Sequence, residues 1–152
     1  MQKILVFGIG NPYRCDDSVG LKIADSLKEK INDPHITIKS GSIDGLAVLD
    51  EMLGYDKVFF IDSIETKKGK PGDIYKIELD PCSKTLSVSA SHNIDFATAI
   101  RMGQRFGYQM PKIISVYAVE IENNTSFNEE CTKKVKASIP KVVKRIMDEI
   151  NE

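Results

Sequence analysis

The sequence predicts a three-layer α/β/α fold, in which a mostly parallel, twisted sheet of five strands has helices on both faces. Short apolar runs alternate along the chain with segments whose apolar residues recur at helical spacing. Strands that alternate with helices imply right-handed crossovers, and therefore parallel neighbouring strands. The run 58–61 is apolar throughout, which is typical of a central strand covered by helices on both faces.

The first half of the chain contains three expected strands with a helix in each interval. Each strand is a short apolar run, and each helix shows apolar residues three or four positions apart. Asp16 or Asp17 is the natural N-cap of the first helix, and Asp44 is that of the second. In chain order the segments are the strand 3–7, the helix face of Val19, Ile23, Ala24, Leu27 and Ile31, the strand 36–40, the helix face of Leu46, Leu49, Met52 and Leu53, and the strand 58–61.

The second half contains two more strands and two more helices. A Lys- and Gly-rich turn, 67–72, precedes a segment whose alternating pattern favours an edge or antiparallel strand. Ser91 is placed to cap the next helix, with His92 in its first turn. In chain order the segments are the strand 73–79, the helix face of Phe96, Ala97, Ile100 and Gly103, the strand 113–119, and the helix face of Val135, Ile139, Val142, Val143, Ile146, Met147 and Ile150.

Composition sets limits on the class of protein. The length of 152 residues predicts a single domain, 1–152, and a monomer is the simplest expectation. The formal net charge is -1, and no Lys/Arg run is longer than a pair, so we expect no nucleic-acid partner. No stretch approaches the ~20 apolar residues of a membrane span, so we expect no membrane partner. Three widely separated cysteines give neither a disulfide framework nor a CxxC metal site, which favours the cytoplasm.

Several residues that can carry chemistry follow expected strand ends. Ligands of an open α/β sheet gather outside the carboxyl ends of its strands, so these residues are candidates for a site. They are the segment 8–11 with Asp16 and Asp17 after the first strand, Gly41 and Ser42 after the second, Asp62 and Ser63 after the third, and His92 at the start of a helix. Two carboxylates and an imidazole suit a divalent metal of borderline softness, such as zinc or nickel.

Each candidate also has a structural interpretation. Asp16 and Asp17 are, by residue type, more often helix caps than metal ligands. Asp62 suits a turn at a strand end as well as a functional role, and a lone histidine such as His92 is usually not a ligand. Cys15 is more readily explained as a buried structural thiol than as a ligand. Taken one at a time, these residues leave the function open.

Their joint pattern is more specific. The blocks Gly-Ile-Gly-Asn-Pro-Tyr-Arg-Cys-Asp-Asp-Ser-Val-Gly (8–20), Phe-Ile-Asp-Ser-Ile (60–64) and Ser-His-Asn (91–93) resemble, in order and spacing, the signature blocks of hydrogenase maturation proteases. The resemblance covers nearly the whole chain, and the first block is its most specific part. It implies that Asp17, Asp62 and His92 bind nickel.

The resemblance also implies an activity. Members of this family remove the C-terminal extension of a nickel-iron hydrogenase large-subunit precursor after nickel insertion. The nickel is then expected to be supplied by the precursor, and another divalent metal such as zinc or cadmium can occupy the site in vitro. A nickel held by the substrate accounts for the lack of the His-Glu-x-x-His motif of self-sufficient zinc proteases.

Two chemical routes stay open at this point. Either the metal polarises the scissile carbonyl or its bound water, or a nearby acid acts as general base. Asp16, beside the ligand Asp17, is available for the second route, so the expected catalytic residues are Asp17, Asp62 and Asp16.

The chain departs from the family pattern in the loop after the second strand. Relatives often have an Asp before this turn, where Lys39 stands here. The role of that Asp is therefore lost, moved to Asp44 or adapted to another precursor. We expect this loop to contact the substrate through Gly41, Ser42, Asp44 and Gly45.

Two alternative functions remain. Gly-Ile-Gly-Asn-Pro (8–12) is also similar to the start of peptidyl-tRNA hydrolase, but that family has an Arg-His-Asn triplet near Cys15 to Asp17 of this chain. The other alternative function is that of a nickel-dependent assembly chaperone, which inspects the precursor without cutting it. A dinucleotide site is rejected because Tyr13 replaces the third glycine of its fingerprint.

Overall fold

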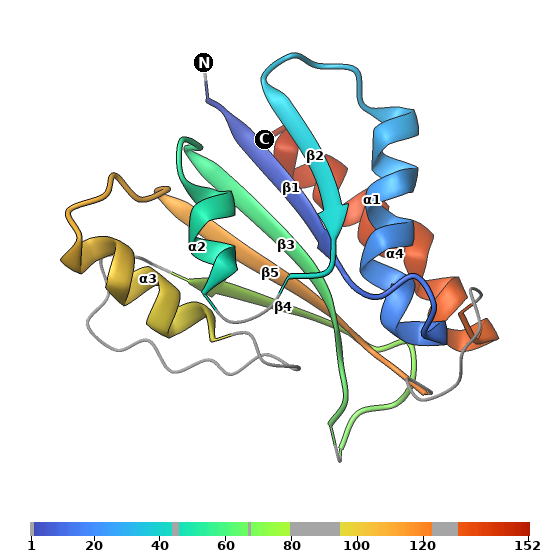
Figure 1. The fold of residues 1–152 in the computed structure, drawn as a ribbon. Coiled ribbons are helices and arrows are strands. Elements are labelled where there is room, and N and C mark those ends of the chain that lie inside the picture. Colours follow the sequence, from blue (N-terminus) through green and yellow to red (C-terminus); the bar gives the residue numbers. More distant parts are fainter. Residues whose placement is uncertain (1, 44–45, 67, 80–94, 123–130) are drawn as a thin grey trace.

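The computed structural model describes residues 2–43, 46–66, 68–79, 95–122 and 131–152. Its centre is a five-stranded sheet in the order β2-β1-β3-β5-β4 (Figure 1). Strands β2, β1, β3 and β5 run parallel, and β4 runs antiparallel to β5. The expected mostly parallel sheet and its antiparallel edge strand are both confirmed.

The elements follow the expected order. Most strands and helices begin or end one to three residues away from the positions expected from the sequence. The reason is that strand pairing and the last helical turns extend past the apolar runs. The elements are β1 Ile4–Ile9, the short 3-10 helix η1 Cys15–Ser18, α1 Val19–Lys30, β2 Ile36–Gly41, α2 Ala47–Met52, β3 Lys57–Ile64, β4 Ile74–Leu79, α3 Phe96–Arg105, β5 Ile113–Glu120 and α4 Lys133–Ile150.

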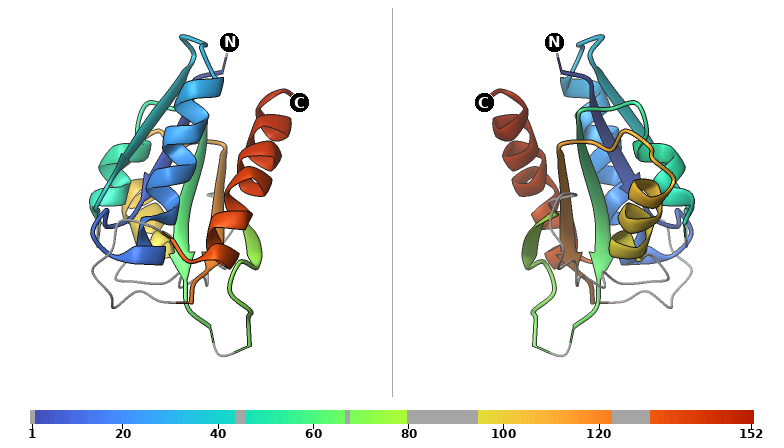
Figure 2. Two further views of the ribbon diagram at one scale, coloured as in Figure 1. Left: turned by 90° about the vertical axis from the view of Figure 1, so that its right-hand side faces the viewer. Right: turned by 90° about the vertical axis from the view of Figure 1, so that its left-hand side faces the viewer.

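Helices cover both faces of the sheet, as the two turned views show (Figure 2). On one face, α2 and α3 pack over alternate sheet residues such as Val58 and Phe60. On the other face, α1 and α4 pack over Phe59, Ile61 and Tyr117. Because successive strand residues point to opposite faces, both apolar sets of β3 are buried, which explains its continuous apolar run. The α/β/α layering is therefore confirmed.

Three local expectations are wrong. Helix α1 begins at Val19 with Ser18 at its N-cap, and no side chain caps it, so neither Asp16 nor Asp17 has that role. Both lie in η1, where the chain makes an extra turn before the helix. Helix α3 begins at Phe96, and Asp95 caps it by accepting a hydrogen bond from the Thr98 N–H at 3.0 Å.

The expected cap Ser91 and first-turn position of His92 are therefore wrong for α3, because its N-cap comes later in the sequence. Both residues lie outside the described part of the chain. Helix α2 begins at Ala47 after Leu46, and its expected cap, Asp44, also lies outside that part. Among the described residues, no helix is both long and apolar enough to cross a membrane.

Candidate active site

The Gly-rich block after β1 allows a very close approach of helix and strand. A Cβ placed on Gly10 would lie 2.2 Å from the carbonyl oxygen of Asp17, and one on Gly8 would lie 2.2 Å from that of Gly20. The backbone N–H of Asn11 also donates to the Asp17 carbonyl at 3.3 Å. These contacts exclude any side chain at either position, and they hold the turn that carries Asp17 against the carboxyl end of β1.

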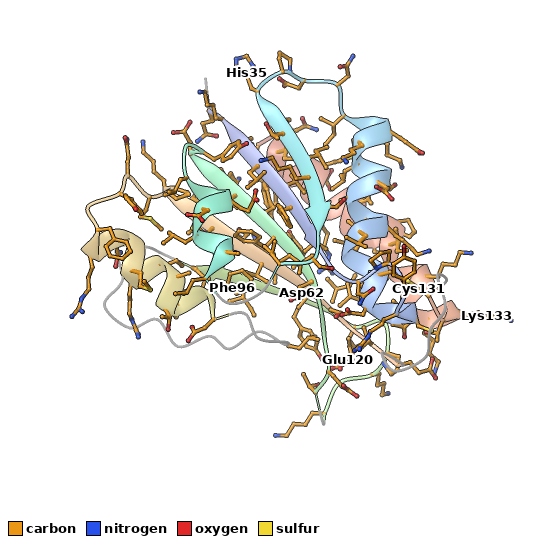
Figure 3. The ribbon with its side chains drawn as sticks, viewed as in Figure 1. His35, Asp62, Phe96, Glu120, Cys131 and Lys133 are labelled. Carbon is orange, nitrogen blue, oxygen red and sulfur yellow. The ribbon has the colours of Figure 1, made fainter. Side chains whose placement is uncertain are left out.

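The turn itself has an unusual backbone. Cys15, the first residue of η1, has a φ of 29°, a left-handed conformation that non-glycine residues rarely adopt. Its carbonyl accepts a hydrogen bond from the Ser18 hydroxyl at 2.7 Å. The Cys131 thiol lies 3.7 Å from the same carbonyl, and Figure 3 shows it beside the start of α1. Burial raises the pKa of that thiol, which disfavours the thiolate that a metal ligand or nucleophile requires. Cys15 is buried, as expected of a structural thiol.

Ser63 hydrogen-bonds to both Asp17 and Asp62. The Ser63 hydroxyl donates a hydrogen bond of 2.8 Å to Asp17 Oδ1. The Ser63 backbone N–H donates one of 2.8 Å to Asp62 Oδ1. Asp17 comes from η1 and Asp62 from β3, so a single serine orients two carboxylates from segments that are far apart in the sequence. Oriented carboxylates of this kind are suitable ligands for a divalent metal.

Asp62 lies inside a strand and not after one, which corrects the expected end of β3 at Ile61. The β1–β3 ladder does end at Ile61, which is paired with Gly8, while Asp62 continues the ladder with Ala118 of β5. Its side chain is 1% exposed and shares the strand face of Phe60. Because Gly8, near the carboxyl end of β1, pairs with Ile61, Asp62 lies at the edge of the sheet where ligands of such sheets bind.

Asp16 is fully buried and faces a different set of partners. Its Oδ1 accepts a hydrogen bond from the Thr132 N–H at 2.6 Å. Its Oδ2 accepts bonds from the Glu122 N–H at 2.9 Å and from the Thr132 hydroxyl at 3.0 Å. These contacts favour a positioning role for Asp16, which joins η1 to the end of β5 and the start of α4. The general-base role expected from the sequence stays a prediction.

The Gly41–Ser42 pair adjoins the same turn. The Ser42 hydroxyl donates a 2.7 Å hydrogen bond to the Gly10 carbonyl, and the Gly10 N–H donates one of 3.2 Å to the Gly41 carbonyl. Lys39 forms an ion pair of 3.4 Å with Glu51 of α2. This lysine therefore contacts a helix of its own chain.

Three expected site residues, His92, Asp44 and Gly45, lie outside the described part of the chain. Within the described ranges, which omit His92, no group of three or more His, Cys, Asp or Glu residues is arranged to hold a metal. Sequence reasoning missed the roles of Ser63 and Thr132. Ser63 had a signal, because it is the polar residue next to a strand-end acid, whereas the contact of Thr132 with Asp16 spans 116 residues and has no local signal.

Comparison with known proteins decides the family. The model of the HycI family, described as hydrogenase maturation protease, matches residues 21–149. The chain belongs to this family. It is a hydrogenase maturation endopeptidase, which processes the C-terminus of the hydrogenase large subunit. The family match gives no support to the peptidyl-tRNA hydrolase alternative, and it favours a peptidase over a non-catalytic chaperone.

Individual relatives agree with this assignment. The protease is 27% identical to the hydrogenase 2 maturation protease of Escherichia coli over 99% of this chain and 92% of that protein. Its structure is similar to that of a hydrogenase maturating endopeptidase from E. coli, with a TM-score of 0.78 and 25% identity over 98% and 92% of the two chains. A maturation protease from Thermococcus kodakarensis shares the fold, with a TM-score of 0.73 and 21% identity over 99% and 94% of the chains.

Proposed function

We propose that this maturation protease cuts its precursor only after nickel has been inserted, and that it detects the nickel with Asp17, Asp62 and His92. In this proposal the nickel belongs to the substrate, a large-subunit precursor of a nickel-iron hydrogenase. Zinc or cadmium can occupy the same ligands in vitro. The protease is proposed to act as a monomer in the cytoplasm.

The shared contact of Asp17 and Asp62 with Ser63 is the observation that carries the proposal. Both carboxylates have a fixed orientation, and they lie at the carboxyl edge of the sheet, where the family's substrate site is expected. Two hard oxygen ligands together with the imidazole of His92 make a donor set that nickel accepts, with coordination positions left for the precursor. Ser63 would act as an outer-shell residue that fixes the ligand geometry.

In this proposal, few side chains of the protease itself take part in the cleavage of the peptide bond. When bound, the nickel would supply Lewis-acid polarisation of the scissile carbonyl or of an attacking water. Asp17 and Asp62 would hold the reacting region in place, and an acid of the site that does not bind the metal would act as the general base. Asp16, with its oxygens already engaged by Glu122 and Thr132, would keep the η1 turn in the geometry that Asp17 needs.

The loop after β2 is proposed as a substrate contact. Among the described residues, apart from its chain neighbours, none has an atom within 4 Å of the position that a Cβ on Gly41 would occupy. The hydrogen bonds that tie Gly41 and Ser42 to Gly10 fix this backbone next to the turn of Asp17. Asp44 and Gly45 are proposed to continue the contact. An extended precursor segment could then lie along this edge and bond to the loop backbone.

Mass spectrometry tests the nickel requirement. The protease is incubated with nickel-loaded and nickel-free precursor from the same source, and the precursor's mass is followed. Loss of a C-terminal peptide from the loaded form alone is expected. Equal cleavage of both forms would refute nickel detection, while tight binding of the loaded form without any loss of mass would favour the chaperone alternative.

Three single changes test the ligand set. Asp17→Ala, Asp62→Ala and His92→Ala should each abolish processing of the loaded precursor. Each variant should keep the far-UV circular dichroism of the wild type, because its ligand side chain is expected at the sheet's edge. Unfolding of all three variants would assign these residues to structural roles instead. Lys39→Ala is the matched control at the same edge of the sheet, and it should process the loaded precursor like the wild type. The exposed ion pair of Lys39 with Glu51 contributes at most ~1 kcal/mol to the free energy of unfolding.

A further inference from the structure

A pocket of about 330 Å³ lies between the loop after β1 and the first turns of α1. We name it the Tyr13 pocket, and it is lined by Pro12, Tyr13, Ser18, Leu21, Lys22 and Asp25. Ser18 follows Asp17 directly in the chain, so their Cα atoms are about 3.8 Å apart. One lining residue of the pocket is therefore the chain neighbour of Asp17.

Tyr13 is the most exposed large apolar residue of the described chain, with 63% of its surface accessible. Its backbone is nevertheless held in place, because its N–H donates a 2.9 Å hydrogen bond to the Asn11 side chain. The Arg14 N–H adds a 3.3 Å bond to the Asn11 carbonyl, and Pro12 restricts its own φ. An aromatic ring on a pre-ordered turn can bind a partner at low entropic cost, and tyrosine is enriched among residues that dominate binding energy.

The other side of the pocket combines apolar and charged groups. Leu21 is partly buried and presents an apolar surface opposite the loop. Lys22 and Asp25 are three residues apart on α1 and therefore neighbours on its surface. In the part of the chain that the structure describes, neither forms an ion pair within 4.0 Å with another residue. Both charges are available to a partner that also has an apolar side chain.

We propose that the Tyr13 pocket binds the precursor segment next to the scissile bond and seats one of its apolar side chains against the Tyr13 ring. This inference rests on the proposed function, since the precursor must reach Asp17 and Asp62. An extended polypeptide rises ~3.3 Å per residue, so a segment bound at Asp17 reaches the pocket within a few residues. The neighbouring Lys22 and Asp25 contact polar groups of the same segment, which makes the pocket a determinant of specificity.

Kinetics and binding measurements with a matched control test this inference. Tyr13→Ala removes the ring, and Tyr13→Phe keeps it. The control Tyr108→Ala removes another exposed ring, 46% accessible, on the connection between α3 and β5. The centroid of that ring lies 5.5 Å from the centroid of the Phe106 ring. Cleavage of loaded precursor gives kcat and KM for each variant. Fluorescence anisotropy of labelled precursor gives its Kd.

Tyr13→Ala should raise KM and Kd about tenfold or more with kcat within about twofold, while Tyr13→Phe and Tyr108→Ala stay close to the wild type. Equal KM and Kd for Tyr13→Ala and Tyr108→Ala would overturn the inference and leave the proposed function intact. If the wild type binds without cutting, the proposed function fails, but a selective loss of binding in Tyr13→Ala would still support the pocket. If the wild type neither binds nor cuts, both fail.

Discussion

The carboxylate of Asp16 accepts hydrogen bonds from both the backbone N–H and the hydroxyl of Thr132, at 2.6 and 3.0 Å. Thr132 is the N-cap residue of α4, and its own side chain caps no backbone group of that helix. The Glu122 N–H is a third donor, at 2.9 Å, just beyond the end of β5. One buried side chain therefore connects three segments next to Asp17, and it fixes the turn on which that proposed ligand depends.

Asp16→Asn should destabilise the protein. The backbone donors Thr132 N–H and Glu122 N–H face different oxygens of Asp16, so an amide NH₂ opposes one of them in either orientation. We expect a loss of about 2 kcal/mol in the free energy of unfolding in urea, together with weaker processing. Asp148→Asn, at an exposed position of α4, should change stability by less than about 0.5 kcal/mol. Wild-type stability with abolished cleavage would instead support the general-base role.

Ser63→Ala tests the orientation of the two proposed ligands. The change removes the hydroxyl that holds Asp17 Oδ1 but keeps the N–H that holds Asp62. Loss of such an outer-shell contact typically costs about 10- to 100-fold in metal affinity, so titration with nickel should show weaker binding of this order. Ser115→Ala, at a buried serine of β5, is the control and should bind nickel like the wild type. Equal affinity in both variants would remove Ser63 from the site.

The fold was predictable because its signals are local. Each strand of the sheet is a short apolar run, and each long helix shows one apolar face, so alternation alone gives the α/β/α layers. The antiparallel β4 was indicated by the alternating pattern of apolar and polar residues in the segment 73–79. The caps were not predictable, because Asp16 and Asp17 have the residue type of an N-cap but bond to Thr132 and Ser63 instead.

The site was predictable to a smaller degree. Asp62 was identified because it follows an apolar run at the expected end of a strand and because it lies in the signature block 60–64. The contacts of Ser63 with Asp17 and of Asp16 with Glu122 depend on segments that only the folded chain brings together. No periodicity or spacing encodes such tertiary hydrogen bonds, so sequence patterns name the ligands but not the residues that hold them.

Gly10→Ala should disrupt the site through its backbone. The added Cβ would lie 2.2 Å from the Asp17 carbonyl oxygen, so the η1 turn must move away from β1. Such overpacking costs about 3 kcal/mol, and the displaced Asp17 should also bind nickel less tightly. Gly41→Ala is the matched control, since no described residue beyond its chain neighbours has an atom within 4 Å of the added Cβ. Its stability should stay within about 0.5 kcal/mol of the wild type. Equal unfolding free energies for the two variants would contradict the close packing.

Asp95→Ala should lower stability in a pH-dependent manner. Hydrogen bonds from the Thr98 hydroxyl and then its N–H hold the pKa of Asp95 below the ordinary 3.8. The folded state therefore favours the ionised carboxylate, and this contribution is present above the ordinary pKa and lost as the pH falls through the lowered one. We expect a cost of about 1 kcal/mol at pH 7 that shrinks towards pH 3, measured by urea unfolding at both values. Asp95→Asn keeps an acceptor for the cap and should have a stability close to that of the wild type at pH 7. If Asp95→Ala lowers stability by the same amount at both pH values, ionisation of Asp95 does not contribute to the cap.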